Sequence, residues 1–332
     1  MKIKKLIAVL SAGTLAALSL AGCSGSPKTA DGGAASSDKV YKVGICQLVQ
    51  HEALDKATEG FKDALIEKLG EGNVEFDEQN AANDSATCAT IVNQFVASNT
   101  DLIFANATPA LQAAASATLE IPIVGTSITD YATALDIDDW TGTTGRNITG
   151  TSDLAPLAEQ AAMFKELLPD AKTIGLLYCS SEANSKYQVD VVTEELTNLG
   201  YEWVPYAFSD SNDVAAVVTS ACENSDALYI PTDNTAAANT EIIANIANPA
   251  NIPVIAGEEG ICRGCGIATL SISYYSIGKI AGEMAYEILA NGADPAEMEV
   301  KFADELTKKY NKERAEKLNI TIPEGYEELA AE

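Results

Sequence analysis

From Val40 onward, hydrophobic and polar positions form two alternating kinds of segment. Short apolar runs rich in β-branched residues, such as KVGICQLV and DLIFANA, have the pattern of buried strands. Longer amphipathic stretches separate them; residues 52–70 place Leu54, Phe61 and Leu65 on one helical stripe. Strands that alternate with helices in this way are typical of a parallel sheet covered by helices.

The series of strands and helices occurs twice. The first set has strands at KVGICQLV, VEFDEQ, DLIFANA and IPIVGTS, and the second has strands at TIGLLYC, EWVPYAF, ALYIPTD and IPVIAGE. Matching residues recur at nearly constant spacing: Gly44 and Gly175 are 131 apart, Asp101 and Asp226 are 125 apart, and Ile121 and Ile252 are 131 apart. This repetition indicates a duplicated unit. It predicts an α/β fold of two doubly wound, Rossmann-like lobes joined by a hinge.

The predicted lobes have approximate boundaries in the sequence. Lobe one is expected at 40–152 and lobe two at 153–259. The next segment, about 260–290, has a strand at IATLSIS and a helix over 275–290, which we expect to return to lobe one and so form a hinge. The tail, 291–332, is expected to complete lobe two with a strand that leads into a charged helix.

The N-terminal residues have the pattern of a secretory signal. Lys2, Lys4 and Lys5 precede the apolar residues 6–20, and the segment ends at LSLAGC. Residues 1–22 resemble a bacterial lipoprotein signal peptide. The resemblance implies cleavage before Cys23 and a lipid on its thiol, which would hold the domain on a membrane without crossing it. A plain secretory signal is the alternative, and residues 23–39, rich in Ser, Gly, Ala and Asp, predict a flexible tether.

Charge and cysteine content exclude several functional classes. The formal net charge of −27 becomes −30 when cleavage removes three lysines and no acid (−27 − 3 = −30), so nucleic acid is not an expected partner. Six cysteines remain after Cys23, and a zinc site is disfavoured because only Cys262 and Cys265 form a CxxC and His51 is the single histidine. The CxxC pair predicts either a local disulfide or two free thiols. We expect no metal, no cofactor and no catalysis, since the sequence has neither a P-loop nor a nucleophile elbow.

Several motifs across about 40–290 together carry a family resemblance. They are VGICQLVQHEALD, DLIFANATPA, IPIVGTSITD, NITGTSD, NSKYQV, YIPTDN and ISYYSIG. The chain resembles the ABC transporter substrate-binding proteins of the type 1 periplasmic-binding fold, and within them the subgroup associated with tryptophan and other aromatic amino acids. Two features depart from the family pattern: Tyr131 stands where a proline is usual, and the CxxC is not a family feature.

The resemblance implies an extracytoplasmic protein that captures a small amino acid-like ligand, such as tryptophan, tyrosine or phenylalanine, between its lobes. It also implies ABC permease subunits as partners and no enzymatic activity. A sugar- or nucleoside-binding protein of the same fold is one alternative, although the chain offers only three arginines as forked donors. A receptor that presents its ligand to a sensor kinase is the other.

The candidate ligand residues follow from the repeat and from the chemistry of an amino acid. Loops at the carboxyl ends of parallel strands line the cleft of such folds. The ligand carboxylate would be bound at helix starts, the ammonium by an acid, and the side chain by an apolar or aromatic wall. The residues are Gln47, Leu48, Val49, Thr108, Ser127, Thr129, Asp130, Asn184, Ser185, Asp233, Asn234, Glu258 and Tyr275. Ordinary capping is the alternative for the polar ones, and helix packing for the tyrosine.

Overall fold

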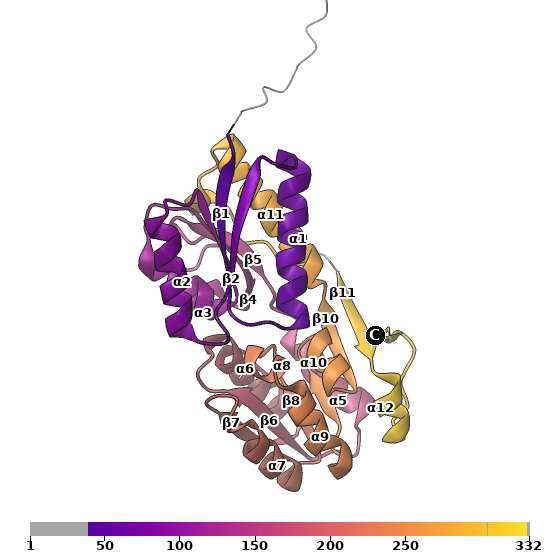
Figure 1. Cartoon of the computed structure of the whole chain (residues 1–332). Helices are drawn as coiled ribbons and strands as arrows, with labels where there is room; N and C mark the ends of the chain where they lie inside the picture. The colour runs from indigo at the N-terminus through magenta and orange to yellow at the C-terminus, as the bar shows by residue number, and fades with distance from the viewer. Residues whose placement is uncertain (1–38, 304, 331–332) are drawn as a thin grey trace, which may run out of the picture. The chain divides into compact units, whose positions relative to one another are not determined.

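The computed structural model describes residues 39–303 and 305–330, and it has an α/β architecture with two sheets (Figure 1). The expected signal peptide, Cys23 and residues 23–38 of the tether lie outside this range. Within it, no helix is both long enough and apolar enough to cross a bilayer.

Lobe one is built on a five-stranded parallel sheet with the order β2-β1-β3-β4-β5. The strands are β1 (Tyr41–Gln47), β2 (Val74–Asn80), β3 (Leu102–Asn106), β4 (Ile123–Ile128) and β5 (Ile148–Ser152). The connecting helices are α1 (Glu52–Leu69), α2 (Ser85–Ala97), α3 (Thr108–Ala117) and the short α4 (Tyr131–Leu135). Because β1, β3, β4 and β5 are buried on both faces, separate apolar clusters lie on either side of the sheet, whereas the edge strand β2 is largely exposed.

Lobe two is built on a seven-stranded sheet with the order β12-β11-β10-β9-β8-β6-β7. Its parallel strands are β6 (Thr173–Cys179), β7 (Glu202–Phe208), β8 (Ala227–Ile230), β9 (Val254–Ala256) and β10 (Ala268–Ile272). The helices are α5 (Leu157–Leu167), α6 (Ala183–Leu199), α7 (Val214–Asn224), α8 (Asn234–Ala237), α9 (Thr240–Ala250) and α10 (Glu259–Gly264). Apolar clusters again lie on both faces of the sheet.

Residues at matching positions in the repeat have matching structural roles. The Asp101 carboxylate accepts the backbone N–H of Lys42 at 2.8 Å, and the Asp226 carboxylate accepts that of Lys172 at 2.8 Å. Each aspartate therefore fixes the start of the first strand of its lobe. The strand order β2-β1-β3-β4-β5 of lobe one also corresponds to β7-β6-β8-β9-β10 of lobe two. The doubly wound, duplicated fold predicted from the sequence is confirmed.

The strand predicted to return to lobe one does not do so. This strand is β10, and it pairs in parallel with β9 of lobe two. The helix that follows, α11 (Tyr274–Asn291), lies beside α1 and also contacts β4 and β5 of lobe one (Figure 1). The prediction for the strand was wrong because an apolar strand fits either sheet, and this one extends the lobe-two sheet beside β9.

Glycines allow α11 to approach α1 closely. A Cβ atom at Gly278 would collide with the backbone carbonyl oxygen of Ala57, and one at Gly60 would collide with that of Tyr275. Each helix thus contributes a glycine at a point where the other helix's backbone passes. This contact attaches α11 to lobe one although the strand before it belongs to lobe two.

The tail connects both lobes before it ends on lobe two. Thr151 of β5 forms a parallel bridge with Lys301, so the segment after α11 adds to lobe one. The chain then crosses to lobe two, where β11 (Leu306–Tyr310) pairs antiparallel with β10. A short helix, α12 (Lys312–Lys317), and the two-residue strand β12 (Glu327–Glu328) follow. The chain therefore passes between the lobes at three places: after β5, after β10 and after Lys301.

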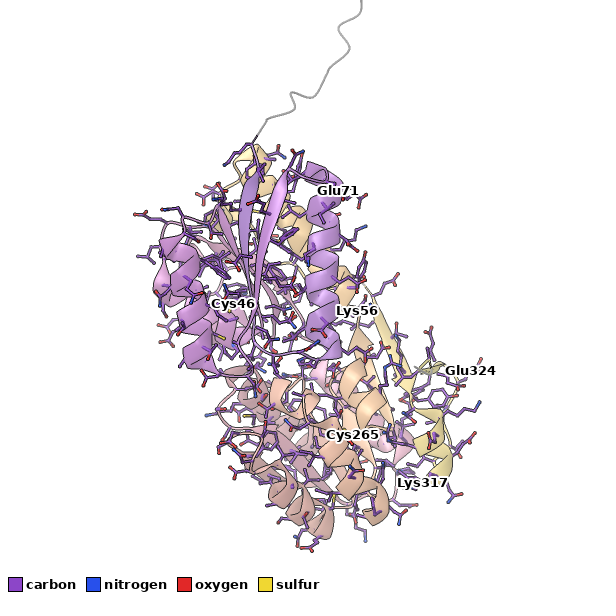
Figure 2. All side chains as sticks on the ribbon, viewed as in Figure 1. Cys46, Lys56, Glu71, Cys265, Lys317 and Glu324 are labelled. Atoms are coloured by element: carbon purple, nitrogen blue, oxygen red, sulfur yellow. The ribbon has the colours of Figure 1, made fainter. Side chains whose placement is uncertain are left out.

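The six described cysteines carry free thiols. All are buried except Cys222, which is half-buried; Cys46 of lobe one and Cys265 of lobe two are labelled in Figure 2. Of the two possibilities for the CxxC pair, the structure has two buried thiols, and the Cys265 thiol lies 3.3 Å from the Ile261 carbonyl oxygen. Within residues 39–303 and 305–330, no cluster of His, Cys, Asp and Glu side chains is arranged to hold a metal ion.

Candidate ligand site between the lobes

Most of the predicted ligand residues lie at the carboxyl ends of strands. In lobe one, Leu48 and Val49 follow β1, Thr108 begins α3, and Ser127, Thr129 and Asp130 lie at the end of β4 or just after it. In lobe two, Asn184 and Ser185 lie in the first turn of α6, Asp233 and Asn234 follow β8, and Glu258 follows β9. These are the positions at which open α/β sheets bind ligands.

Hydrogen bonds join the two sets of strand ends. They are Gln188 Nε2 to Thr129 Oγ1 at 3.4 Å, Asn83 Nδ2 to Thr235 Oγ1 at 2.9 Å, and the His51 ring nitrogen Nε2 to Asn234 Oδ1 at 3.2 Å. Burial lowers the pKa of His51, so its neutral ring donates to the Asn234 carbonyl oxygen. The carboxyl ends of the two sheets therefore face each other, as the repeat predicted.

Asp153 is a buried carboxyl where the chain leaves β5 for lobe two. Its Oδ1 accepts the Thr129 hydroxyl at 3.1 Å and its Oδ2 accepts the Tyr274 hydroxyl at 2.9 Å. The residue is 4% exposed, and no ion pair joins it to a lysine or arginine in the described part of the chain. Burial raises the pKa of Asp153 to about 6, while the two hydroxyl donors oppose the shift. A buried carboxylate with no cation is costly, and a cationic ligand group would offset that cost.

A second buried carboxylate, Glu182, organises the lobe-two side. Its Oε2 accepts the side-chain amides of Asn184 at 3.0 Å and Asn234 at 2.7 Å. Its Oε1 accepts the backbone N–H of Thr235 at 2.9 Å and the hydroxyl of the same residue at 2.8 Å. Glu182 thus fixes the rotamers of two predicted ligand residues and holds the start of α8 against the start of α6.

The three predicted acids serve as helix caps in this structure. Asp130 accepts the backbone N–H of Thr133 at 2.7 Å at the start of α4. Asp233 accepts those of Ala236 at 2.7 Å and Cys179 at 2.6 Å. Glu258 caps α10 by accepting two backbone N–H groups, one of them from Gly260 at 2.6 Å. Capping was the alternative role that the sequence left open for these acids. Their carboxylate oxygens are largely engaged by backbone N–H groups.

Two of these caps are buried and carry perturbed pKa values. Burial, and then the nearby Glu182 charge, raise the pKa of Asp233. Burial raises the pKa of Glu258 to about 7, although its two backbone N–H donors oppose the shift. Neither carboxyl has an ion-pair partner in the described residues. The lobe-two edge of the cleft is therefore rich in buried acids.

The other predicted residues differ in their availability to a ligand. The Gln47 side-chain amide donates hydrogen bonds to Asp55 at 2.6 Å and to the Val49 carbonyl oxygen at 2.9 Å. Its carbonyl oxygen accepts the Thr58 hydroxyl at 2.7 Å, so all three partners lie within lobe one. Thr108 is the first residue of α3, and the cap is Ala107. Tyr275 points to Asp63 of α1, with its hydroxyl donating at 3.0 Å, whereas its neighbour Tyr274 points to Asp153. Tyr274 is thus the tyrosine directed to the junction of the lobes.

Two buried polar atoms near the inter-lobe contact have no protein partner among the described residues. They are the Ser127 hydroxyl oxygen in lobe one and Asn184 Oδ1 in lobe two. Ser127 also has a φ of 55°, in the left-handed region that a serine rarely adopts. Ser127 lies two residues before Thr129, and Asn184 lies one helical turn before Gln188. Each lobe therefore has one unpaired buried polar atom in a segment that also contributes to the Thr129–Gln188 bond, and unpaired buried groups of this kind call for a partner.

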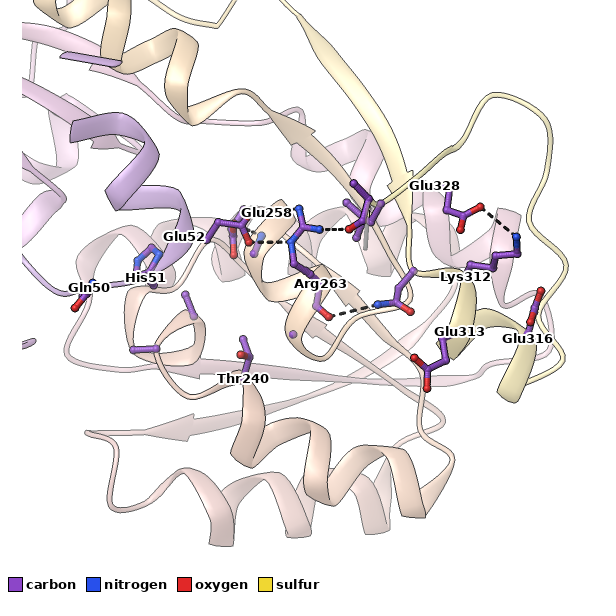
Figure 3. A pocket seen from close by; sticks show the side chains of 17 residues that line it. Gln50, His51, Glu52, Thr240, Glu258, Arg263, Lys312, Glu313, Glu316 and Glu328 are labelled. Atoms are coloured by element: carbon purple, nitrogen blue, oxygen red, sulfur yellow. Dashed lines mark hydrogen bonds and ion pairs between the residues drawn. The ribbon is translucent and has the colours of Figure 1, made fainter. Parts of the chain in front are cut away.

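Two cavities open where α1 meets lobe two, and neither is lined by Thr129, Asp153 or Asn184. One, of about 790 Å³, is lined by His51, Glu52, Glu258, Arg263 and residues of α12 and β12 (Figure 3). The other, of about 240 Å³, is lined by Ala53, Ile272, Tyr274 and Tyr275 together with charged residues of α10 and β11. Of the predicted ligand residues, only Glu258 and Tyr275 line them.

Three members of this candidate site, Asp153, Gln188 and Glu182, were not predicted from the sequence, and of two adjacent tyrosines Tyr275 was selected and not Tyr274. A signal was present for the first, because Asp153 directly follows a strand in the motif NITGTSD, as the predicted acids follow theirs. Gln188 falls one turn after Asn184 in NSKYQV, on the same face of the helix. No signal separated Tyr274 from Tyr275, because the two are adjacent at a helix start.

Known proteins resemble the chain over nearly its whole described length. A "Tyrosine-binding protein" of Clostridioides difficile (strain R20291) is 39% identical over 293 residues, covering 87% of this chain and 85% of the relative. A Streptococcus pneumonia ABC domain crystallised in complex with L-Trp is 34% identical with a TM-score of 0.83, covering 86% of this chain and 97% of that one.

A third relative was solved in a different state. The ligand-free, open structure of a substrate binding protein with adhesive properties from Clostridium difficile is 37% identical, covering 88% of this chain and all of that one. Its TM-score is 0.66, lower than that of the L-Trp complex despite the similar identity. The described structure is therefore closer to the ligand-bound relative than to the open one.

The profile of one family matches residues 42–332, which include both sheets and every predicted ligand residue. The chain belongs to the ABC transporter substrate binding protein family.

Proposed function

We propose that this protein is the ligand-binding subunit of an ABC importer and that it captures an aromatic amino acid between its lobes. Family membership supports the import role, in which the ligand passes to permease subunits on the extracytoplasmic side of a membrane. The names of the relatives, one tyrosine-binding and one crystallised with L-Trp, support an aromatic side chain. Under this proposal Cys23 carries the lipid that tethers the domain to the membrane.

The observation that carries the proposal is Asp153. It is a buried carboxyl at the junction of the lobes, held by the Thr129 and Tyr274 hydroxyls and lacking a described lysine or arginine. An α-ammonium group would form a charge-assisted hydrogen bond with it and offset its desolvation. A neutral sugar has no charge to offer, so this residue favours an amino acid.

The remaining ligand groups have matching partners. Asn184 Oδ1 is an unpaired acceptor and suits another N–H of the ammonium, while the Ser127 hydroxyl is available to donate to the carboxylate. Leu48 and Val49 after β1 and the ring of Tyr274 offer an apolar wall. The proposed ligand site therefore retains Leu48, Val49, Ser127, Thr129 and Asn184 from the sequence and adds Asp153, Gln188 and Tyr274.

A thermal-shift screen of the purified domain tests the proposal directly. L-Tyrosine, L-tryptophan and L-phenylalanine would be compared with sugars and nucleosides at equal concentrations. A ligand at about 100 times its Kd adds about 2.7 kcal/mol to the free energy of unfolding, which is a readily measured shift. We expect a shift with at least one aromatic amino acid. A shift with sugars or nucleosides alone would contradict the proposal.

Ligand affinity is expected to fall in acid. In the ligand-free protein the pKa of Asp153 is raised to about 6, and the bound ammonium would lower it by favouring the carboxylate. Protonation of Asp153 therefore opposes binding, so Kd should be constant above pH 7 and rise up to about tenfold per pH unit below pH 6. Isothermal titration calorimetry between pH 5 and 8 would measure this. A Kd that is flat across the range would remove the carboxylate from the ammonium site.

A further inference from the structure

A second set of contacts between the lobes involves an ion pair that the ligand site does not use. Glu52, the first residue of α1 in lobe one, pairs with Arg263 in the last turn of α10 in lobe two. The guanidinium donates from Nε to Glu52 Oε2 at 3.0 Å and from one terminal nitrogen to Glu52 Oε1 at 3.1 Å (Figure 3). We propose that this pair is a latch that holds the lobes closed and sets how long the ligand stays bound, which rests on the proposed function.

Arg263 is already held in place by groups of its own lobe. Its guanidinium donates to Glu259 at 2.7 Å, one turn earlier in α10, and to the carbonyl oxygen of Ala330 in the tail at 2.5 Å. Lys309 of β11 pairs with the other Glu259 oxygen at 2.6 Å. These partners do not depend on closure. The side chain is therefore pre-organised to meet Glu52, and little conformational entropy remains to be lost when the lobes close.

The start of α1 is also the part of lobe one that approaches α10 closely. A Cβ atom built on Gly260 would lie 3.4 Å from the Glu52 Cβ, so the backbone of α10 passes close to the start of α1. The neighbouring His51 makes the hydrogen bond to Asn234. When the lobes are closed, Glu52 therefore lies next to α10 and forms a bidentate, charge-assisted pair with Arg263.

The position of the pair decides which equilibrium it affects. A partly exposed ion pair within one lobe contributes little to folding. This pair spans two lobes that have to separate for the ligand to leave, so opening breaks it while both lobes stay folded. The pair therefore stabilises the closed state and slows ligand dissociation. Because the Glu52 side chain is 38% exposed, salt should weaken the pair.

Stopped-flow dissociation of L-tyrosine and L-tryptophan from the full domain would test the latch. We expect Glu52→Gln to raise the dissociation rate about threefold to fivefold at low salt, with the association rate nearly unchanged. In 1 M salt the wild-type rate should approach that of the variant. Glu59→Gln is the matched control, since Glu59 lies on the same helix and pairs with Lys56 at 2.7 Å inside lobe one.

Two further comparisons make the result decisive. In an Arg263→Gln background, Glu52→Gln should have no additional effect, because the pair is already broken. Small-angle X-ray scattering of the ligand-free protein gives a readout that needs no ligand, and Glu52→Gln should increase the radius of gyration at low salt relative to Glu59→Gln. Unchanged dissociation and scattering in Glu52→Gln would overturn the latch. If no amino acid binds but the scattering changes as expected, the latch stands and the proposed ligand fails.

Discussion

Replacing Asp153 with asparagine should abolish most of the ligand affinity while leaving the protein at least as stable. The variant keeps the shape of the side chain and its capacity to bond the Thr129 and Tyr274 hydroxyls, but it removes the charge that faces the ammonium. Loss of one partner of a buried charge pair costs about 2–5 kcal/mol, so Kd should rise about 30-fold or more. Calorimetry with L-tyrosine and L-tryptophan at pH 7.5 would measure this.

The stability of the same variant distinguishes a ligand role from a structural one. The pKa of Asp153 in the folded protein lies above the ordinary value of 3.8, so its ionisation destabilises the ligand-free protein as pH rises through about 6, and the penalty is fully present at pH 7.5. Asparagine removes that penalty, so the urea midpoint should be unchanged or higher. Asp130→Asn is the control, because asparagine can retain the cap of α4 and Kd should change little. A destabilised Asp153→Asn variant with normal Kd would contradict the assignment.

Replacing Gly278 with alanine should strongly destabilise lobe one. The added methyl group would collide with the carbonyl oxygen of Ala57, and backbone in the middle of α1 cannot move away as a flexible side chain could. Such overpacking costs about 1–3 kcal/mol, which exceeds the gain of up to about 1 kcal/mol in helix propensity over glycine. The urea midpoint at 25 °C should therefore fall.

A matched control for this variant lies on the opposite face of the same helix. Glu283 is exposed, so Glu283→Ala should change the free energy of unfolding by no more than about 0.5 kcal/mol. If Gly278→Ala were as stable as that control, the close approach of α11 to α1 would not contribute to the fold as described.

The architecture was predictable because its signals are repeated along the chain. Each lobe supplies several strands, so the alternation of apolar runs with amphipathic stretches is sampled many times. Equivalent residues such as Asp101 and Asp226 confirm the duplication by making the same backbone contact. The position of β10 was not predictable from such signals, because the choice of sheet depends on which edge is free after α10 and not on the composition of the strand.

The ligand site was less accessible to sequence reasoning. The rule that ligands bind at the carboxyl ends of strands selected loops that the structure brings together, and it named Thr129, which forms the inter-lobe bond with Gln188. It could not distinguish acids that cap a helix from an acid that does not, because Asp130 and Asp233 follow strand ends in the same way as Asp153. What distinguishes Asp153 is the hydroxyl of Tyr274, a residue 121 positions away.

The three crossings between the lobes have a consequence for dividing the protein. A fragment that ends at Ser152 would contain every strand of the first sheet but would leave bare the face that α11 covers, including Phe61 and Phe104. Neither lobe is a contiguous stretch of chain, so each half made separately should aggregate, and co-expressed halves should reassemble only if the piece carrying α11 is present. In gene fusions or circular permutants of this protein, insertion points and new termini should therefore be placed in surface turns within a lobe and not at the junction between the lobes.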